Sequence, residues 1–122
     1  MKKRGMKFEF AAADRIIFGP DTFQMTAKLA AELGRSAFII TGSSGRHTGE
    51  LSRRLGSAGL RTAVSHISGE PTTERALAVV KVARRFSADL VIAVGGGSVI
   101  DTGKAAAALL TNKGDLFDYL EV

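Results

Sequence analysis

The chain has 122 residues, of which 45% are hydrophobic and 24% charged, a composition typical of one folded domain with a packed core. Its net charge of +5 comes from 17 basic and 12 acidic residues, which form no basic stripe interleaved with aromatic residues, so we expect no nucleic-acid partner. No apolar run approaches the roughly 20 residues of a membrane helix, and the absence of cysteine excludes disulfides, thiolate zinc sites and thiol nucleophiles. We therefore expect a cytoplasmic protein with no membrane partner.

The beginning of the chain carries the pattern of two short strands and a helix. The segments KFEF (7–10) and RIIF (15–18) alternate between apolar and polar residues around a short connection, which predicts an N-terminal β-hairpin. Asp21 or Thr22 can then cap a helix that runs to Leu33.

Three apolar segments separated by helical patterns predict a parallel sheet, because strands buried on both faces read as continuous apolar runs. These strands are expected at 36–41, 60–67 and 88–94. Helices are expected to end at Gly59, to run from the N-cap Thr72 to Phe86, and to run from about Val99 to Asn112. In the first of them, Leu51, Leu55 and Ala58 should face the core. The second of them has apolar residues at the helical spacing of three and four: Ala76, Val79, Val80, Ala83 and Phe86. The predicted fold is an α/β, Rossmann-like parallel sheet with flanking helices.

Three consecutive glycines, Gly95–Gly97, connect the strand 88–94 to the last helix. Backbone N–H groups at a helix N-terminus bind anions, and missing β-carbons let a phosphate approach the main chain, with Ser98 as a further donor or helix cap. The alternative is a tight turn without a ligand. The spacing matches neither the G-x-G-x-x-G fingerprint, whose third glycine would replace Ile100, nor the P-loop, so Lys104 is not a Walker lysine.

Two charged residues of the last helix have two interpretations each. Asp101, in the first turn of the expected helix, either gains from the helix dipole alone or binds an amide or sugar hydroxyl of a ligand. Lys104 either extends into solvent or contacts a cofactor or another part of the protein. In parallel sheets ligands bind beyond the carboxyl ends of the strands, so the loops Thr41–Gly45 and Gly95–Ser98 are expected to line the site.

The stretch AVGGGSVIDTGKA (93–105) resembles the iron-containing, or group III, alcohol dehydrogenase family, in which GGGS is followed by an aspartate and a GKA-like segment. The resemblance extends to IIFGPDTF, SAFIITG, EPTTE and LLTNKGDLFDYL, and so to nearly the whole chain. It implies the fold of the dehydroquinate synthase-like superfamily. It also implies reversible hydride transfer between a small alcohol or aldehyde and NAD(P), with a divalent metal, usually Fe²⁺, as the Lewis acid.

The resemblance also implies which residues bind the cofactor. The pyrophosphate would lie on the glycine motif, the ribose and nicotinamide end near the aspartate, and the adenosine ribose near the loop after the first buried strand. These residues are Gly42, Ser43, Ser44, Gly96, Gly97, Ser98 and Asp101. Members that prefer NAD often carry an aspartate where Gly42 stands, so the resemblance favours NADP or the use of both cofactors, with Arg46 close behind. Glu70 replaces a common asparagine and receives no role.

The family's metal ligands, an aspartate and three histidines, belong to a helical second domain. The two histidines of this chain, His47 and His66, precede the glycines, so we assign no metal ligand and no catalytic residue. His47 can reach a cofactor phosphate, whereas His66 is expected to be an ordinary strand residue. We therefore expect residues 1–122 to be an N-terminal NAD(P)-binding domain without the C-terminal metal-binding domain, inactive by itself.

Two other functions remain open from the sequence. Glycerol dehydrogenase and dehydroquinate synthase-like enzymes look similar around the glycines but often carry lysine where this chain has Ser98, which favours the alcohol dehydrogenase interpretation. A nucleotide-binding module without catalysis is the second alternative. The sequence also leaves open whether identical copies assemble into a homo-oligomer.

Overall fold

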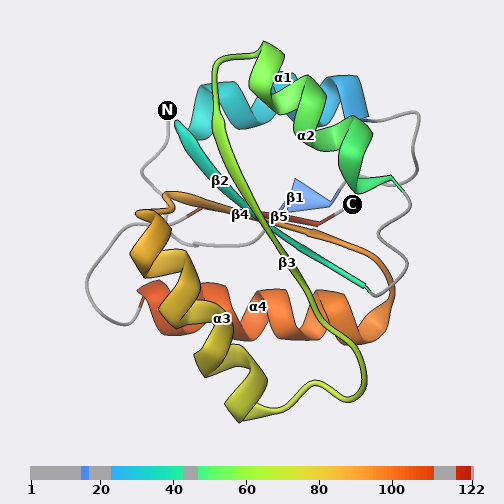
Figure 1. Ribbon diagram of the computed structural model, residues 1–122, viewed down its shortest axis with the longest axis vertical. Helices are drawn as coiled ribbons and strands as arrows, with labels where there is room; N and C mark the ends of the chain where they lie inside the picture. Colours follow the sequence, from blue (N-terminus) through green and yellow to red (C-terminus); the bar gives the residue numbers. More distant parts are fainter. Residues whose placement is uncertain (1–14, 17–22, 43–46, 112–117, 122) are drawn as a thin grey trace.

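The strands of the computed structural model lie in one five-stranded parallel sheet, in the order β1-β5-β4-β2-β3 (Figure 1). The structure describes residues 15–16, 23–42, 47–111 and 118–121. The strands are β1 (Arg15–Ile16), β2 (Ser36–Thr41), β3 (Arg61–His66), β4 (Leu90–Val94) and β5 (Asp118–Glu121). The helices are α1 (Phe23–Leu33), α2 (Thr48–Ser57), α3 (Thr73–Phe86) and α4 (Gly97–Thr111). The predicted α/β sheet with flanking helices is confirmed.

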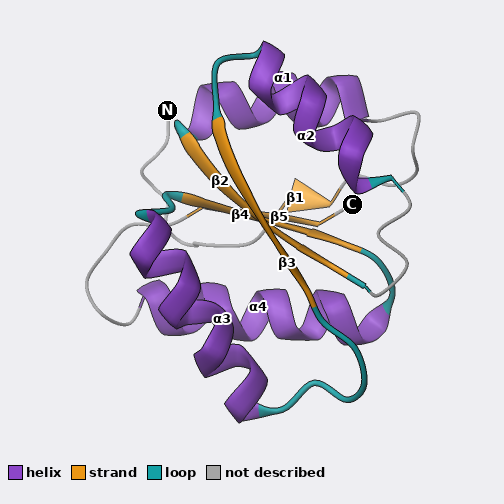
Figure 2. Ribbon diagram, in the orientation of Figure 1, coloured by secondary structure: helices purple, strands orange, loops and turns teal. Residues whose placement is uncertain are grey.

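Helices cover both faces of the sheet, α1 and α2 on one face and α3 and α4 on the other (Figure 2). Side chains of β2 alternate between the layers: Phe38 and Ile40 pack with α3 and α4, whereas Ala37 and Ile39 pack with α1 and α2. All six residues of β2 are buried, which explains its unbroken apolar run. Among the described residues, no helix has both the length and the apolar character that crossing a bilayer requires.

Helix α3 forms where the sequence predicts it. The Thr72 hydroxyl accepts a hydrogen bond from the backbone N–H of Arg75 at 3.1 Å and so caps the first turn. The helix ends at Ser87, whose φ of 63° lies in the left-handed region. Its buried residues recur at the helical spacing of three and four: Ala76, Val79, Val80 and Ala83.

Other expectations differ from the structure. The expectation that Ala58 faces the core is wrong, because α2 ends at Ser57 and Ala58 is its exposed C-cap. Helix α4 begins at Gly97 rather than near Val99, and it is followed by β5, a strand that we did not predict. The first strand of the expected hairpin, 7–10, lies outside the described residues, and β1 pairs in parallel with β5.

The chain reverses its direction across the sheet between β2 and β4. From β2 it passes through α2 to β3 at the sheet edge, and then through α3, on the opposite face, back to β4 (Figure 1). Helices α2 and α4 therefore leave the ends of two adjacent strands on opposite faces, with Thr41 and Val94 side by side at this edge. Such a switch point leaves a crevice, where parallel α/β folds bind their ligands.

The amino-terminal edge of the sheet is closed by protein groups. The Asp89 carboxylate accepts hydrogen bonds from the backbone N–H groups of Arg35, at 3.1 and 3.2 Å, and Ser36, at 3.0 Å. The Arg61 guanidinium donates to the Ser36 hydroxyl and to the Phe86 carbonyl, both at 3.1 Å, and lies 4.4 Å from the centre of the Phe86 ring. Polar side chains at this edge thus bind main-chain and side-chain groups of neighbouring strands and loops.

We predict that Gly34→Ala lowers the stability of the fold, because a β-carbon at Gly34 would collide with the Asp89 carboxylate, coming within 2.9 Å of its Cγ. Displacing this carboxylate unpairs the backbone N–H groups that it binds, at a cost of about 1–3 kcal/mol in the free energy of unfolding. Urea denaturation measures the difference. Gly56→Ala is the control, because a β-carbon at that exposed helical position meets nothing within 4 Å. Equal stability of the two variants would contradict the prediction.

Candidate functional site

The first residue after β2 and the first residue after β4 both lie beside the side chain of Val99, in the first turns of α4. A β-carbon built on Gly42, just after β2, would lie 3.6 Å from Cγ2 of Val99, and one built on Gly95, just after β4, would lie 2.9 Å from the same atom. Val99 itself is buried. The ends of β2 and β4 and the start of α4 therefore form one continuous surface at the carboxyl edge of the sheet.

The three consecutive glycines serve different purposes. Gly95 has a φ of 152°, a conformation that side chains disfavour, and a β-carbon there would also lie 3.1 Å from Cβ of Val99. In contrast, β-carbons on Gly96 and Gly97 would meet nothing within 4 Å, and both residues are exposed. The fold thus explains Gly95 but not the other two glycines. The main chain at Gly96 and Gly97 is therefore open to the close approach of a ligand.

Helix α4 presents its N-terminus at this surface. It begins at Gly97, and the N–H group of Ile100 makes the first turn's hydrogen bond, to the Gly96 carbonyl at 3.0 Å. The N–H groups that precede Ile100 in the helix have no intrahelical acceptor, and the dipole of a 15-residue helix favours a negative charge beside them. Together with the exposed Ser98 they can bind a phosphate group.

Because α4 begins at Gly97, Asp101 lies beyond its first turn, which contains no acidic residue. The interpretation of Asp101 as a first-turn residue is therefore wrong, and stabilisation by the helix dipole loses weight as an explanation, because that effect fades within one turn. The Asp101 side chain is exposed and available to a ligand. Lys104 is also exposed, although it takes part in an interaction within the protein.

The end of β2 is tied to the start of α2 by a buried pair of hydroxyl groups. Thr48 donates to the hydroxyl of Thr41 at 3.1 Å, and both residues are buried. Gly42 follows at once and is partly buried. Ser43 and Ser44, which the resemblance assigns to the adenosine ribose, lie outside the described residues.

His66, which the sequence analysis assigned to a strand without a further role, also lies at this edge. As the last residue of β3 it pairs with Thr41, the last residue of β2. Its side chain is exposed, and its Nδ1 lies 3.4 Å from the carbonyl oxygen of Gly42. The strand pattern gave His66 no special place, since the neighbour that matters comes from another strand.

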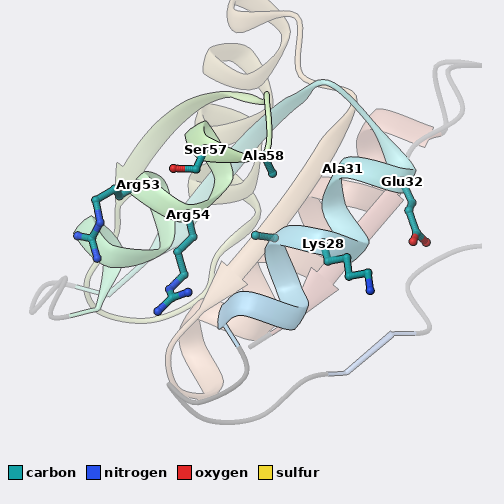
Figure 3. Close-up of a pocket in the computed structure, with 8 residues that line it drawn as sticks. Lys28, Ala31, Glu32, Arg53, Arg54, Ser57 and Ala58 are labelled. Atoms are coloured by element: carbon teal, nitrogen blue, oxygen red, sulfur yellow. The ribbon is translucent and has the colours of Figure 1, made fainter.

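Two further observations concern metal binding and cavities in the described part of the chain. In the parts of the chain that the structure describes, no group of three or more His, Cys, Asp or Glu side chains could hold a metal ion. A shallow cavity of about 710 Å³ lies elsewhere, between α1 and α2 (Figure 3). Its lining includes Lys28, Glu32, Arg53 and Arg54 but none of the glycines at the switch point. The glycines at the strand ends therefore lie apart from this cavity.

Comparison with known proteins places these features in a family. The family model described as iron-containing alcohol dehydrogenase matches residues 13–122. Sulfoacetaldehyde reductase from Bilophila wadsworthia (strain 3_1_6) is 30% identical over 96% of this chain and 32% of its own length. A probable NADH-dependent butanol dehydrogenase 2 from Bacillus subtilis (strain 168) is also 30% identical, over 91% of this chain and 30% of its length.

Solved structures agree with the sequence relatives. The crystal structure of a 1,3-propanediol oxidoreductase superimposes with a TM-score of 0.74 at 26% identity, covering 92% of this chain and 31% of that one. The chain thus spans about a third of the length of the relatives that it matches.

The different roles of the glycines predict different effects of the same substitution. Gly95→Ala should lower the free energy of unfolding by about 1–3 kcal/mol, because it places a side chain on a strained backbone and against Val99. Gly97→Ala should leave it unchanged or raise it by less than about 1 kcal/mol, because alanine favours helix and meets no neighbour. Thermal and urea denaturation test both variants. A Gly97→Ala variant as unstable as Gly95→Ala would mean that the fold, and not a ligand, requires all the glycines.

Proposed function

Because this chain belongs to the iron-containing alcohol dehydrogenase family, we propose that it supplies the nucleotide-binding part of a metal-dependent dehydrogenase that interconverts a small alcohol and its aldehyde with NAD(P). The observation that carries this proposal is the pair of exposed glycines at the N-terminus of α4, where the protein leaves the space of two β-carbons empty. A nucleotide pyrophosphate is the anion that fits an exposed helix N-terminus at a topological switch point.

The proposed roles of the residues follow from their places at the edge. Backbone N–H groups at Gly97 and Ser98, together with the Ser98 hydroxyl, bind the pyrophosphate and offset its charge. Asp101, further along α4, accepts hydrogen bonds from the ribose or amide at the nicotinamide end. The segment Gly42–Ser44 surrounds the adenosine ribose. The bound nicotinamide supplies the hydride chemistry, while these residues hold the nucleotide in place.

The cofactor preference proposed is NADP, or both NADP and NAD. No carboxylate stands at Gly42, where a side chain would have room, since its β-carbon would make only an ordinary contact with Val99 at 3.6 Å. A carboxylate at this place accepts hydrogen bonds from the ribose hydroxyls and repels a 2′-phosphate. Its absence removes that repulsion without preventing NAD from binding.

The metal ion proposed for the activity, Fe²⁺ or another divalent cation, has no fitting set of ligands among the described residues. We therefore assign no step of the reaction to a metal held by them. The substrate is proposed to be a small alcohol or aldehyde, and the location the cytoplasm. The contribution of this domain is to bind and orient the nucleotide.

Titration calorimetry of the purified chain with NADPH and with NADH tests the proposal. We expect at least one of the two nucleotides to bind. Gly97→Val should abolish binding while leaving the circular-dichroism spectrum nearly intact, because the added β-carbon meets no protein atom within 4 Å and the side chain occupies the proposed phosphate site.

The matched control is Gly56→Val, in the last turn of α2, where an added β-carbon also meets nothing within 4 Å. This variant should bind nucleotide like the unaltered chain. Failure of both nucleotides to bind the unaltered chain would refute the proposal, and loss of the fold in Gly97→Val would favour a purely structural turn.

A further inference from the structure

Three neighbouring strands end in a row at the carboxyl edge, in the order β4, β2 and β3. Gly95–Gly97 follow β4, Gly42 follows β2 and His66 ends β3. Adjacent strands in a sheet lie about 4.8 Å apart, so the row extends about 10 Å sideways from the proposed phosphate seat. A nucleotide with its pyrophosphate on the glycines and its adenosine ribose on Gly42 therefore has His66 as its next neighbour in this direction.

Backbone pairing with β2 fixes the position of the His66 main chain at the end of β3. His66 is the register partner of Thr41, and the hydrogen bond from the N–H of Ile67 to the Thr41 carbonyl, at 2.9 Å, continues the ladder past it. His66 therefore lies on the sheet itself rather than on a connecting loop. Its ring lies beside the main chain of Gly42, the residue that follows β2.

The hydrogen-bonding role of each ring nitrogen follows from the chemistry of the Gly42 carbonyl that Nδ1 contacts. The Nδ1 atom lies 3.4 Å from the carbonyl oxygen of Gly42, and a carbonyl only accepts hydrogen bonds. In this contact Nδ1 therefore carries the proton, which leaves Nε2 on the opposite side of an exposed ring. One nitrogen holds the ring at the strand end, and the other is available to a ligand.

The acidic residue in the first turn of α2 forms an ion pair within its own helix. The carboxylate of Glu50 accepts a hydrogen bond from Nε of Arg54 at 3.0 Å, one turn further along the same helix. It thus lies against its own helix, whereas a carboxylate that discriminates against a 2′-phosphate has to reach the ribose.

Resting on the proposed function, we propose that His66 contacts the 2′ position of the adenosine ribose and determines the preference between NADP and NAD. With both ring nitrogens protonated, Nε2 donates a charge-assisted hydrogen bond to a 2′-phosphate. The neutral ring accepts a hydrogen bond from a 2′-hydroxyl through the same atom. His66 therefore accommodates both cofactors and binds the phosphorylated one more strongly.

The variant that tests this role is His66→Asn. The asparagine amide can still donate to the Gly42 carbonyl in place of Nδ1, but it has no atom in the place of Nε2. Calorimetry of the chain with NADP⁺ and with NAD⁺ should show the dissociation constant for NADP⁺ rising about tenfold, the loss of one charge-assisted hydrogen bond. The dissociation constant for NAD⁺ should rise only about two- to threefold, which corresponds to the loss of one neutral hydrogen bond at the low end of its usual range.

Arg85→Gln is the control for charge. It removes a positive charge from an exposed residue in the last turn of α3 and should leave the ratio of the two dissociation constants unchanged. An equal loss of both nucleotides in His66→Asn, or no loss of either, would overturn the assignment of His66 while leaving nucleotide binding established. Failure of the unaltered chain to bind either nucleotide would overturn the proposed function and this assignment with it.

Discussion

Burial of β2 and β4 on both faces is the constraint on which the rest of the structure depends. A strand that buries every side chain needs a helical layer on each side, so the crossovers that follow these two strands take opposite faces of the sheet. Crossovers that leave two adjacent strands on opposite faces of the sheet do not cover the space between the ends of those strands. The crevice at the carboxyl edge is thus a consequence of how the core is built, and a nucleotide site there needs no separate architecture.

The two edges of the sheet treat their polar groups differently. At the amino-terminal edge, Asp89 and Arg61 bind backbone N–H, hydroxyl and carbonyl groups of neighbouring strands and loops. At the carboxyl edge, the first N–H groups of α4 face outward without an intrahelical acceptor beside exposed glycines. One edge joins strands and loops through side chains, and the other leaves main-chain donors exposed. The nucleotide proposed for this chain would bind at this second edge.

Much of the fold could be predicted from the sequence because its signals are local. The apolar run of β2, the Thr72 cap of α3 and the helical spacing of Val79 and Ala83 each depend on a few consecutive residues, and the structure agrees with them. The inward assignment of Ala58 failed because the end of a helix depends on its capping geometry, which a spacing pattern does not contain. β5 was missed because its place in the sheet is defined by pairing with β4, and not by its own sequence.

For the candidate site, the sequence by itself determined the chemistry: glycines that end a strand and begin a helix can bind a phosphate, and the residues around them resemble one family of dehydrogenases. It could not divide the glycines into roles. Only the tertiary structure decided that the Val99 side chain excludes a β-carbon at Gly95, whereas β-carbons at Gly96 and Gly97 would meet no protein atom within 4 Å. It also placed His66 beside Gly42. The physical reason is that clearance and strand register are relations between segments far apart in the chain, and only folding brings those segments into contact.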